Sequence, residues 1–404
     1  MSECPMNKRP DPLAYPFQDS ERLEVDPAYA RLRAGEGLGR VRPPFGDPGW
    51  LAARHEDVRA VLADTRFSRA RALGDDAPRL VPFLPPPDTI MAMDPPEHNR
   101  LRKMLAQAFT MRRVEKLRPR VQHIVDEQID ALEKAGNEGD LMRSFAVPVS
   151  LTVITELLGV PYEERDRFGG WVGVIFSPDH PPEAAMKANE DLMGYLAGLV
   201  ARRREQPGED LLSVLVEARD AGDRLTESEM VGLAAAVLIA GFDVTSNNLG
   251  NQLYALLSSP SHLRQLRDDP ALVPQAVEEM LRYIRPGTGE SIPRVAAEDV
   301  ELGGTLIKAG EAVLPSLMSA NRDAAVFENP DTMDFTRTHN PHLAFGHGPH
   351  HCVGAQLARL ELQLAIETLL RRLPGLRLAV PADEVPWLPP QAVWSAPVNL
   401  PATW

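Results

Sequence analysis

One long helical stretch, residues 226–259, limits what this chain of 404 residues can fold into. It opens with a capping box, in which Thr226 stands three residues before Glu229, and it meets no proline until Pro260. At 1.5 Å per residue such a helix is about 50 Å long, which is enough to cross a whole domain. Its middle, GLAAAVLIAG, is apolar on every face, so we expect burial on all sides. The chain therefore has to fold around this helix.

The rest of the chain also favours helix over strand. Helical apolar spacing recurs in three further segments, and the first of them should be interrupted near Thr110 and Pro119. These segments are 97–135, 270–283 and 355–373. Short β-like runs lie near 50–53, 292–313 and 376–380. Proline clusters separate these elements, but no Gly/Ser linker or repeat does, so we expect one domain over 1–404, mainly α with a minor β part. Residues 1–20 should form an irregular N-terminal arm.

Charge and composition exclude several classes of function. The net charge of −14 opposes bulk binding to nucleic acid or to an anionic membrane, because both need a basic face. No uninterrupted apolar run approaches the roughly 20 residues that span a bilayer, and the first residues show no apolar signal core. The two cysteines, Cys4 and Cys352, make no disulfide framework. We therefore expect a cytoplasmic protein that uses neither nucleic acid nor membrane.

The stretch HNPHLAFGHGPHHCVGA, residues 339–355, holds five of the ten histidines next to Cys352. A zinc site would need a second ligand pair at short spacing, and none follows here. A surface loop around a buried cysteine is the plainer alternative. However, glycines on both sides of Cys352 allow tight turns and a close approach to a flat ligand. A helix also begins just after Cys352, and the amides and positive dipole end of a helix start stabilise a thiolate.

The pattern Phe345-x-x-Gly348-x-x-x-Cys352-x-Gly354 resembles the haem-binding signature of the cytochrome P450 superfamily. The resemblance implies that Cys352 is the thiolate ligand of the iron of haem b, iron protoporphyrin IX. Such a ligand pushes electron density onto the iron and favours cleavage of the O–O bond. The resemblance extends from about residue 40 to the end. It implies one triangular, mainly α fold with the haem between the long central helix and the helix after the cysteine.

Other landmarks of the family fall in the same order along the chain. Glu279 and Arg282 resemble its Glu-x-x-Arg pair, which shares one helix face. Either Arg337 or Arg322 would complete the network around Glu279, and the sequence leaves that choice open.

The resemblance also implies donors for the two haem propionates. His98 and Arg102, four residues apart on one helix face, match two of them. Arg294 and His350 match two more. Singly each reads equally well as a solvated residue, but four at family positions in an acidic protein favour the site.

The long helix carries a variant of the family's oxygen-activation motif. Gly241 in mid-helix costs roughly 1 kcal/mol relative to alanine, so we expect a local widening of the helix that seats O2. Asp243 matches the acid of the proton relay. The next position is usually threonine but is Val244 here, and Thr245 should face elsewhere because one residue turns a helix by about 100°. Either water or a substrate hydroxyl delivers protons, or the enzyme performs coupling, desaturation or rearrangement without oxygen insertion.

Family positions also indicate a largely apolar substrate wall, in which Met91 adapts to irregular shapes. Its expected members are Ile90, Met91, Ile239, Ala240, Phe242, Glu290, Ile292 and Trp394. Glu290 is the exception: its carboxylate suits an amine-bearing or hydroxylated ligand, although a solvated turn is the safer expectation.

The resemblance is strongest to bacterial enzymes that tailor polyketide macrolides and related metabolites. It implies hydroxylation or epoxidation of a medium-to-large apolar natural product, with O2 as co-substrate. A terpene or fatty-acid hydroxylase and a non-catalytic haem sensor or carrier remain as alternatives. No flavin region is attached, so electrons should come from NAD(P)H through a ferredoxin reductase and a ferredoxin. A basic patch for that partner is expected at Arg100, Lys103, Arg112, Arg113 and Arg359.

Overall fold

The computed structural model describes most of the chain. It covers residues 11–17, 21–80, 84, 87–176, 180–220, 225–285, 292–389 and 395–404. The helices are α1 (Pro27–Ala34), α2 (His55–Ala63), α3 (Glu97–Ala108), α4 (Met111–Ala135), α5 (Val147–Leu157), α6 (Arg165–Phe176), α7 (Pro182–Glu205), α8 (Leu211–Asp220), α9 (Glu227–Leu257), α10 (Pro260–Asp268), α11 (Val273–Tyr283), α12 (Leu317–Ala320) and α13 (Ala355–Arg372). Helix is thus the dominant structure, as expected.

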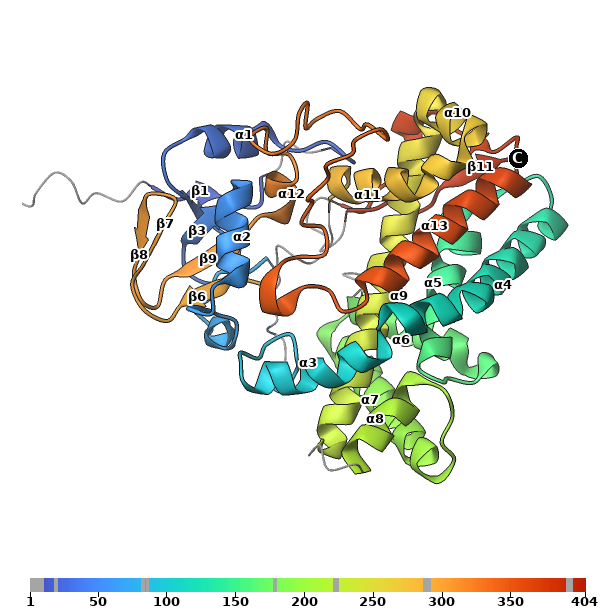
Figure 1. The fold of residues 1–404 in the computed structure, drawn as a ribbon, viewed down its shortest axis with the longest axis horizontal. Helices are drawn as coiled ribbons and strands as arrows, with labels where there is room; N and C mark the ends of the chain where they lie inside the picture. The colour runs from blue at the N-terminus through green and yellow to red at the C-terminus, as the bar shows by residue number, and fades with distance from the viewer. Residues whose placement is uncertain are drawn as a thin grey trace, which may run out of the picture.

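The strands are short and gather mainly at one side of the molecule (Figure 1). They are β1 (Leu13–Ala14), β2 (Gly39–Arg42), β3 (Gly49–Ala52), β4 (Phe67–Ser68), β5 (Glu138–Asp140), β6 (Arg294–Ala296), β7 (Val300–Leu302), β8 (Thr305–Ile307), β9 (Ala312–Pro315), β10 (Arg377–Leu378) and β11 (Pro401–Thr403). The largest sheet has the order β1-β2-β3-β9-β6-β4, and its β3–β9 pair is parallel. The expected irregular arm over 1–20 is wrong in part, because β1 pairs with β2 and Tyr15 is buried.

The long helix α9 is the axis of the fold, with α5 and α7 packed against it (Figure 1). The predicted capping box is present: the Thr226 hydroxyl accepts from the Glu229 amide, and the Glu229 carboxylate accepts from the Thr226 amide. Within the described part of the chain α9 alone is long and apolar enough to span a bilayer. Half of its most apolar window is buried in the protein. The expected burial on all sides is therefore wrong in part, because the face at Ala240 is open.

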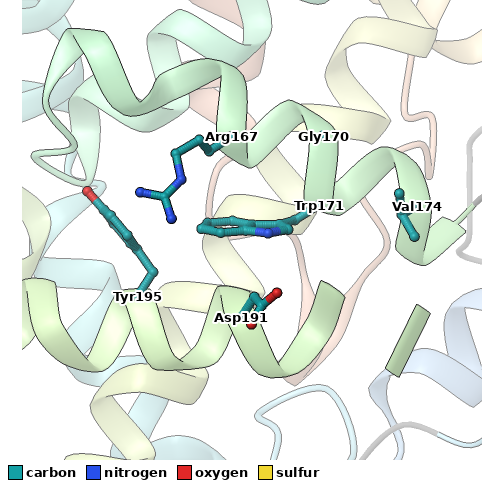
Figure 2. A pocket seen from close by; sticks show the side chains of 6 residues that line it. All are labelled: Arg167, Gly170, Trp171, Val174, Asp191 and Tyr195. Carbon is teal, nitrogen blue, oxygen red and sulfur yellow. The ribbon is translucent and has the colours of Figure 1, made fainter. Parts of the chain in front are cut away.

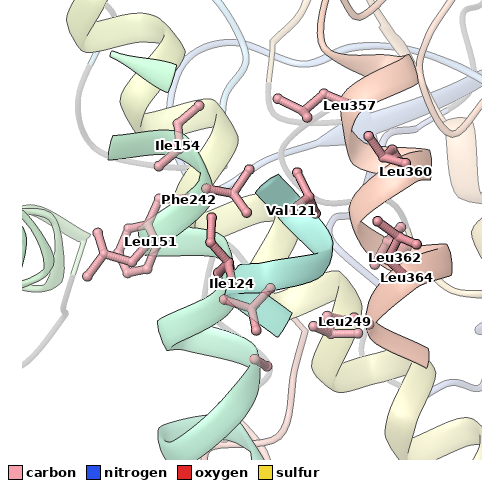
Figure 3. Packing of buried hydrophobic residues seen from close by; sticks show 14 of the residues in the cluster. Val121, Ile124, Leu151, Ile154, Phe242, Leu249, Leu357, Leu360, Leu362 and Leu364 are labelled. Carbon is pink, nitrogen blue, oxygen red and sulfur yellow. The ribbon is translucent and has the colours of Figure 1, made fainter. Parts of the chain in front are cut away.

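The hydrophobic core joins α9 to α4, α5 and α13. Figure 3 shows side chains from these helices meeting there, among them Val121, Leu151 and Leu360. One polar pair lies inside this core: the Ser150 hydroxyl donates to Glu361 at 2.6 Å. The predicted break at Thr110 is confirmed, since α3 ends and α4 begins there. The predicted break at Pro119 is wrong, because α4 continues through it and the burial of its apolar face outweighs one lost hydrogen bond.

Candidate functional site

The segment before α13 is a tightly bonded loop that presents Cys352. The Cys352 amide donates to the Phe345 carbonyl at 2.8 Å, and the Gly346 amide donates to the Leu343 carbonyl at 2.8 Å. The Leu343 amide in turn donates to the Asn321 side chain at 2.7 Å. The loop is therefore held by backbone bonds within itself and by one anchor from the preceding segment.

The position of Gly348 in the loop requires a glycine. Its φ is +70°, a conformation that residues with a side chain rarely adopt. A Cβ here would also overlap the Leu62 carbonyl oxygen and lie 2.8 Å from the Ala63 Cα at the end of α2. The close approach that requires this glycine is thus to α2, whereas the sequence suggested a flat ligand.

The Cys352 thiol is the reactive group of the loop. Cys352 is a free and exposed cysteine, but the dense protein around it still raises the pKa of its thiol through burial. The Gly354 amide, which donates to the sulfur, and the charges of Arg102 and Arg359 oppose that rise. The start of α13 thus lowers the pKa of the thiol, as predicted, but burial raises that pKa by more. Coordination to a metal would deprotonate the thiol outright.

The four predicted propionate donors come together, and the structure adds a further arginine, Arg69, to them. The rings of His98 and His350 lie 3.9 Å apart between centroids. Burial and then the charges of Arg69, His98, Arg294 and Arg102 lower the pKa of His350 far below its ordinary value. No motif marked Arg69, which follows β4 in an irregular segment.

This cluster has more positive charge than the protein neutralises. Burial lowers the pKa of Arg294 to about 10, and Asp94 is the carboxylate that opposes this shift. Asp94 is also the carboxylate that acts on Arg69 and on His98. A buried group of cations favours an anionic partner, and the accessible thiol near Arg102 suits a partner that also binds sulfur. Haem, with two propionates and an iron that takes a thiolate, fits this donor set.

The Glu-x-x-Arg pair is a fully buried ion pair. Arg282 donates to both carboxylate oxygens of Glu279, at 2.7 and 2.8 Å. The third member is Arg337, whose Nε donates to Glu279 at 3.1 Å, and Asn340 adds a bond at 3.2 Å. Arg322 instead pairs with Asp331. Because Glu279 and Arg282 reach from α11 into 321–340, they hold the segment that leads to the cysteine loop.

The neighbouring acid, Glu278, was not expected from the sequence. Arg359 donates to it through two nitrogens, at 2.7 and 2.9 Å, and His342 contacts it at 3.1 Å. Burial would raise the pKa of Glu278, but these hydrogen bonds outweigh burial and lower it to about 2. The Arg359 guanidinium also lies 4.5 Å from the centre of the Phe345 ring. Glu278 therefore braces the cysteine loop from α11.

The central helix has one open face in an otherwise buried length. Ala240 is exposed, and Ala236 and Val244, one turn away on each side, are half-buried. Residues four apart share a helix face, so Val244 belongs to the open face. Thr245 is buried at 8% exposure. The structure therefore agrees with the expectation that Thr245 does not take the place of the missing hydroxyl at 244.

Gly241 has a packing role. Helix α9 is α-helical on both sides of this residue, so the expected local widening is not present. A Cβ on Gly241 would lie 2.7 Å from Cγ1 of Ile154 on α5, which explains the glycine without O2. Asp243 is half-buried and accepts a hydrogen bond from the Asn247 amide at 3.4 Å.

The expected substrate wall is only partly supported. Ile90, Met91, Ile239 and Ile292 are half-buried, as residues beside a binding site would be. Phe242 is 6% exposed and belongs to the core, where it lies beside Leu151 and Ile154 (Figure 3), which argues against a place in that wall. Glu290 and Trp394 lie outside the described residues.

The expected basic patch is smaller than predicted. Arg100 pairs with Glu229, and Arg359 pairs with Glu278, so their charges are neutralised within the protein's own ion pairs. Lys103, Arg112 and Arg113 are exposed, and Met111 beside them is 65% exposed. We restrict the patch to these three cations.

A groove of about 620 Å³ lies elsewhere, between α6 and α7 (Figure 2). Its Arg167 guanidinium stacks 5.0 Å from the centre of the Trp171 ring and near Tyr195. Asp191 on its rim is paired with Lys187. The groove offers stacking surfaces but neither a thiol nor an unbalanced cluster of cations, so the cysteine site remains the candidate.

Comparison with known proteins points to the same site. The chain is 50% identical over 398 residues to nocardicin C N-oxygenase of Nocardia uniformis subsp. tsuyamanensis, covering 98% of this chain and 100% of that protein. It is 45% identical over 395 residues to mycinamicin IV hydroxylase/epoxidase of Micromonospora griseorubida, covering 98% and 99%. A crystal structure of HinD with NMFT and NO superposes with a TM-score of 0.92 at 49% identity, covering 98% of this chain and 100% of that one.

The family profile described as Cytochrome P450 matches residues 175–386, which include the Glu279 network and the cysteine loop. The named activities of the two relatives are oxygenations, which favours an enzyme over a haem sensor or carrier. The thiol loop, the unbalanced cations and these relatives agree. The chain belongs to the cytochrome P450 family and is a haem-iron monooxygenase.

Proposed function

We propose that this monooxygenase hydroxylates or epoxidises a medium-to-large apolar natural product, first of all a polyketide macrolide, in the cytoplasm. The observation that carries the proposal is the accessible Cys352 thiol beside buried cations that lack enough carboxylates. The half-buried apolar residues Ile90, Met91, Ile239 and Ile292 suit an apolar substrate. Support for the substrate class comes from the relative that acts, by its name, on mycinamicin IV.

The roles of this chain's residues follow from their positions. We assign the haem as haem b, held through Cys352 and through propionate contacts from His98, Arg102, Arg294 and His350. When bound, that group supplies the activation of O2 at a thiolate-ligated iron. Phe345, Gly348 and Gly354 shape the loop around the sulfur. We assign the whole chain, residues 1–404, to one domain.

Asp243 is the residue we propose to move protons, since it lies on the central helix next to its open face. Val244 has no donor to pass them on. A water or a substrate hydroxyl therefore completes the route. The substrate-assisted route requires a hydroxyl near the oxidised carbon, whereas the water route does not. Oxidation without oxygen insertion is the second candidate, and Val244 is the observation that favours it.

The separate redox chain is a ferredoxin and its NAD(P)H-dependent reductase. Lys103, Arg112 and Arg113 give an exposed cationic surface on a protein of net charge −14, and ferredoxins are acidic. We place the ferredoxin on this surface.

The first experiment is an optical titration of the ferric holoprotein with macrolides, terpenes, fatty acids and aromatic dipeptides. We expect a low-spin to high-spin shift with macrolides alone. A shift with another class instead would refute the macrolide assignment, and the absence of any haem spectrum would refute the haem site.

The second experiment compares native, Val244→Thr and Thr245→Val proteins with matched substrates that carry or lack a hydroxyl. Product formed per NAD(P)H consumed should fall in native protein when the hydroxyl is removed, and Val244→Thr should restore it. Thr245→Val is the control, since that side chain is buried away from the open face. Coupling that ignores the hydroxyl rejects the substrate-assisted route, and products without added oxygen support the second candidate.

A further inference from the structure

Arg69 stands beside Arg294 at the end of a strand pair. In the antiparallel register of β4 and β6, Ser68 pairs with Val295, and continuing it sets Arg69 opposite Arg294. Like charges directly opposite each other on neighbouring strands repel. Burial and then the Arg294 charge lower the pKa of Arg69 well below its usual value. Two buried arginines in this arrangement call for more negative charge than the single carboxylate of Asp94 supplies.

The nitrogens of the Arg69 guanidinium differ in their hydrogen bonding. Nη1 donates to the Met91 carbonyl at 2.9 Å. Nε is buried and has no hydrogen-bond partner among the described residues. The charge of Arg69 acts on both His350 and His98, so the guanidinium lies within the cation cluster proposed to receive the haem propionates.

The segment that Arg69 holds belongs to the expected substrate wall. Residues 87–94 contain Ile90 and Met91, and they are tied to the site at two points. One is the Met91 carbonyl. The other is Asp94, which accepts from the Arg69 amide at 2.8 Å and from the Ser68 hydroxyl. Arg69 therefore takes part in both attachments, through its side chain and through its main chain.

We propose that Arg69 is a positioning residue that joins the acidic edge of the haem to the substrate-facing segment 87–94. The guanidinium takes a haem carboxylate, and this second contact fixes Nη1 and with it the Met91 carbonyl. Cofactor binding thereby orders the part of the wall that meets the substrate. The inference rests on the proposed placement of the haem acids among these cations and adds a function for Arg69 that His98, Arg102, Arg294 and His350 do not share.

Hydrogen exchange of the 87–94 amides tests the link without any turnover. In native protein we expect exchange at least about tenfold slower with haem bound than in the apoprotein. In Arg69→Met at saturating haem, exchange of 87–94 should rise about tenfold above native holoprotein. Arg294→Met is the matched control, because Arg294 donates its hydrogen bonds to the Ile292 and Pro293 carbonyls and acts on 87–94 only through the charge of Asp94, without a hydrogen bond to that segment. That control should release haem faster, measured by transfer to apomyoglobin, yet keep native exchange in 87–94 when haem is saturating.

Equal exchange of 87–94 in native apoprotein and holoprotein overturns the inference, and this comparison needs no variant to fold. Native exchange in Arg69→Met at saturating haem overturns it as well. If Arg294→Met releases haem faster and Arg69→Met does not, the inference fails while the proposed haem site stands. If neither variant changes haem release, the proposed placement of the propionates fails.

Discussion

Replacing Glu361 with glutamine should remove a loss of folding stability that native protein suffers between about pH 4.5 and pH 7. Glu361 is 2% exposed in the core, and the Ser150 hydroxyl is its hydrogen-bond donor, at 2.6 Å. Burial raises its pKa from 4.5 to about 7, which the bond from Ser150 opposes without cancelling. A carboxyl with a raised pKa stays protonated in the folded protein at pH values where the unfolded chain already ionises. Folding stability is therefore lost as the pH rises from about 4.5 to about 7, and little more is lost above that range.

The size of this loss follows from the pKa difference. One pKa unit corresponds to 1.36 kcal/mol, so raising the pH from 5 to 8 should cost native protein about 2–3 kcal/mol through Glu361. A glutamine side chain at this position carries no charge and can still accept from the Ser150 hydroxyl, so Glu361→Gln should not lose this amount. For a chain of this length that difference corresponds to about 3 °C in Tm.

Thermal unfolding of haem-bound protein at pH 5 and pH 8, at one scan rate, measures the difference. The Tm gap between Glu361→Gln and native protein should widen by about 3 °C at pH 8. Glu367→Gln, on the exposed face of the same helix, is the control and should show no such widening. A constant gap at both pH values would refute the reasoning, because Glu361 would then titrate equally in the folded and unfolded chain.

Three further results are expected. Gly348→Ala should lower the free energy of unfolding by about 2–4 kcal/mol and lower haem retention, because it combines positive φ with overlap against α2. Gly346→Ala has φ +72°, but a Cβ there would lie 3.8 Å from the nearest atom. It should therefore lower the free energy of unfolding by only about 1–2 kcal/mol in the same thermal assay. Glu279→Ala should destabilise the protein by about 3–5 kcal/mol in urea unfolding, because it leaves Arg282 buried without its carboxylate. The double variant Glu279→Ala/Arg282→Met should recover part of the lost stability. If it recovers none, the explanation by an unpaired buried charge is contradicted. Arg112→Glu should slow ferredoxin association about tenfold at low salt and less at high salt, while leaving the substrate spin shift unchanged; a salt-independent effect would exclude a docking role.

Patterns set by local chemistry were predictable from the sequence, and tertiary contacts were not. The capping box at Thr226 and the all-round apolar middle of α9 defined the central helix, because both depend on neighbours in the chain. The break predicted at Pro119 was wrong for the opposite reason. The lost hydrogen bond of a proline is a local effect, whereas the burial that keeps α4 intact comes from packing against α5 and α13.

The site divides in the same way. Cys352 and Glu279 were found because motif spacing marks them. Arg69 and Asp94 had no motif, since they enter the site only through the pairing of β4 with β6 and the path of 87–94. Arg359 was correctly found near the cysteine loop, but its pairing with Glu278 removes the free charge that the sequence suggested.

The two adjacent acids on α11 have a consequence for the motion of the chain. The segment 321–352 contains almost no regular secondary structure, and such segments ordinarily open at little free-energy cost. Here Glu279 binds Arg337 and Asn340, while Glu278 binds His342. Opening this segment therefore breaks charged bonds to the buried face of α11, so an irregular stretch acquires the rigidity of a core helix. The Cys352 thiol is thereby held in one position before any cofactor arrives. Binding a metal through this thiol would not incur the loss of conformational entropy that ordering a flexible loop incurs.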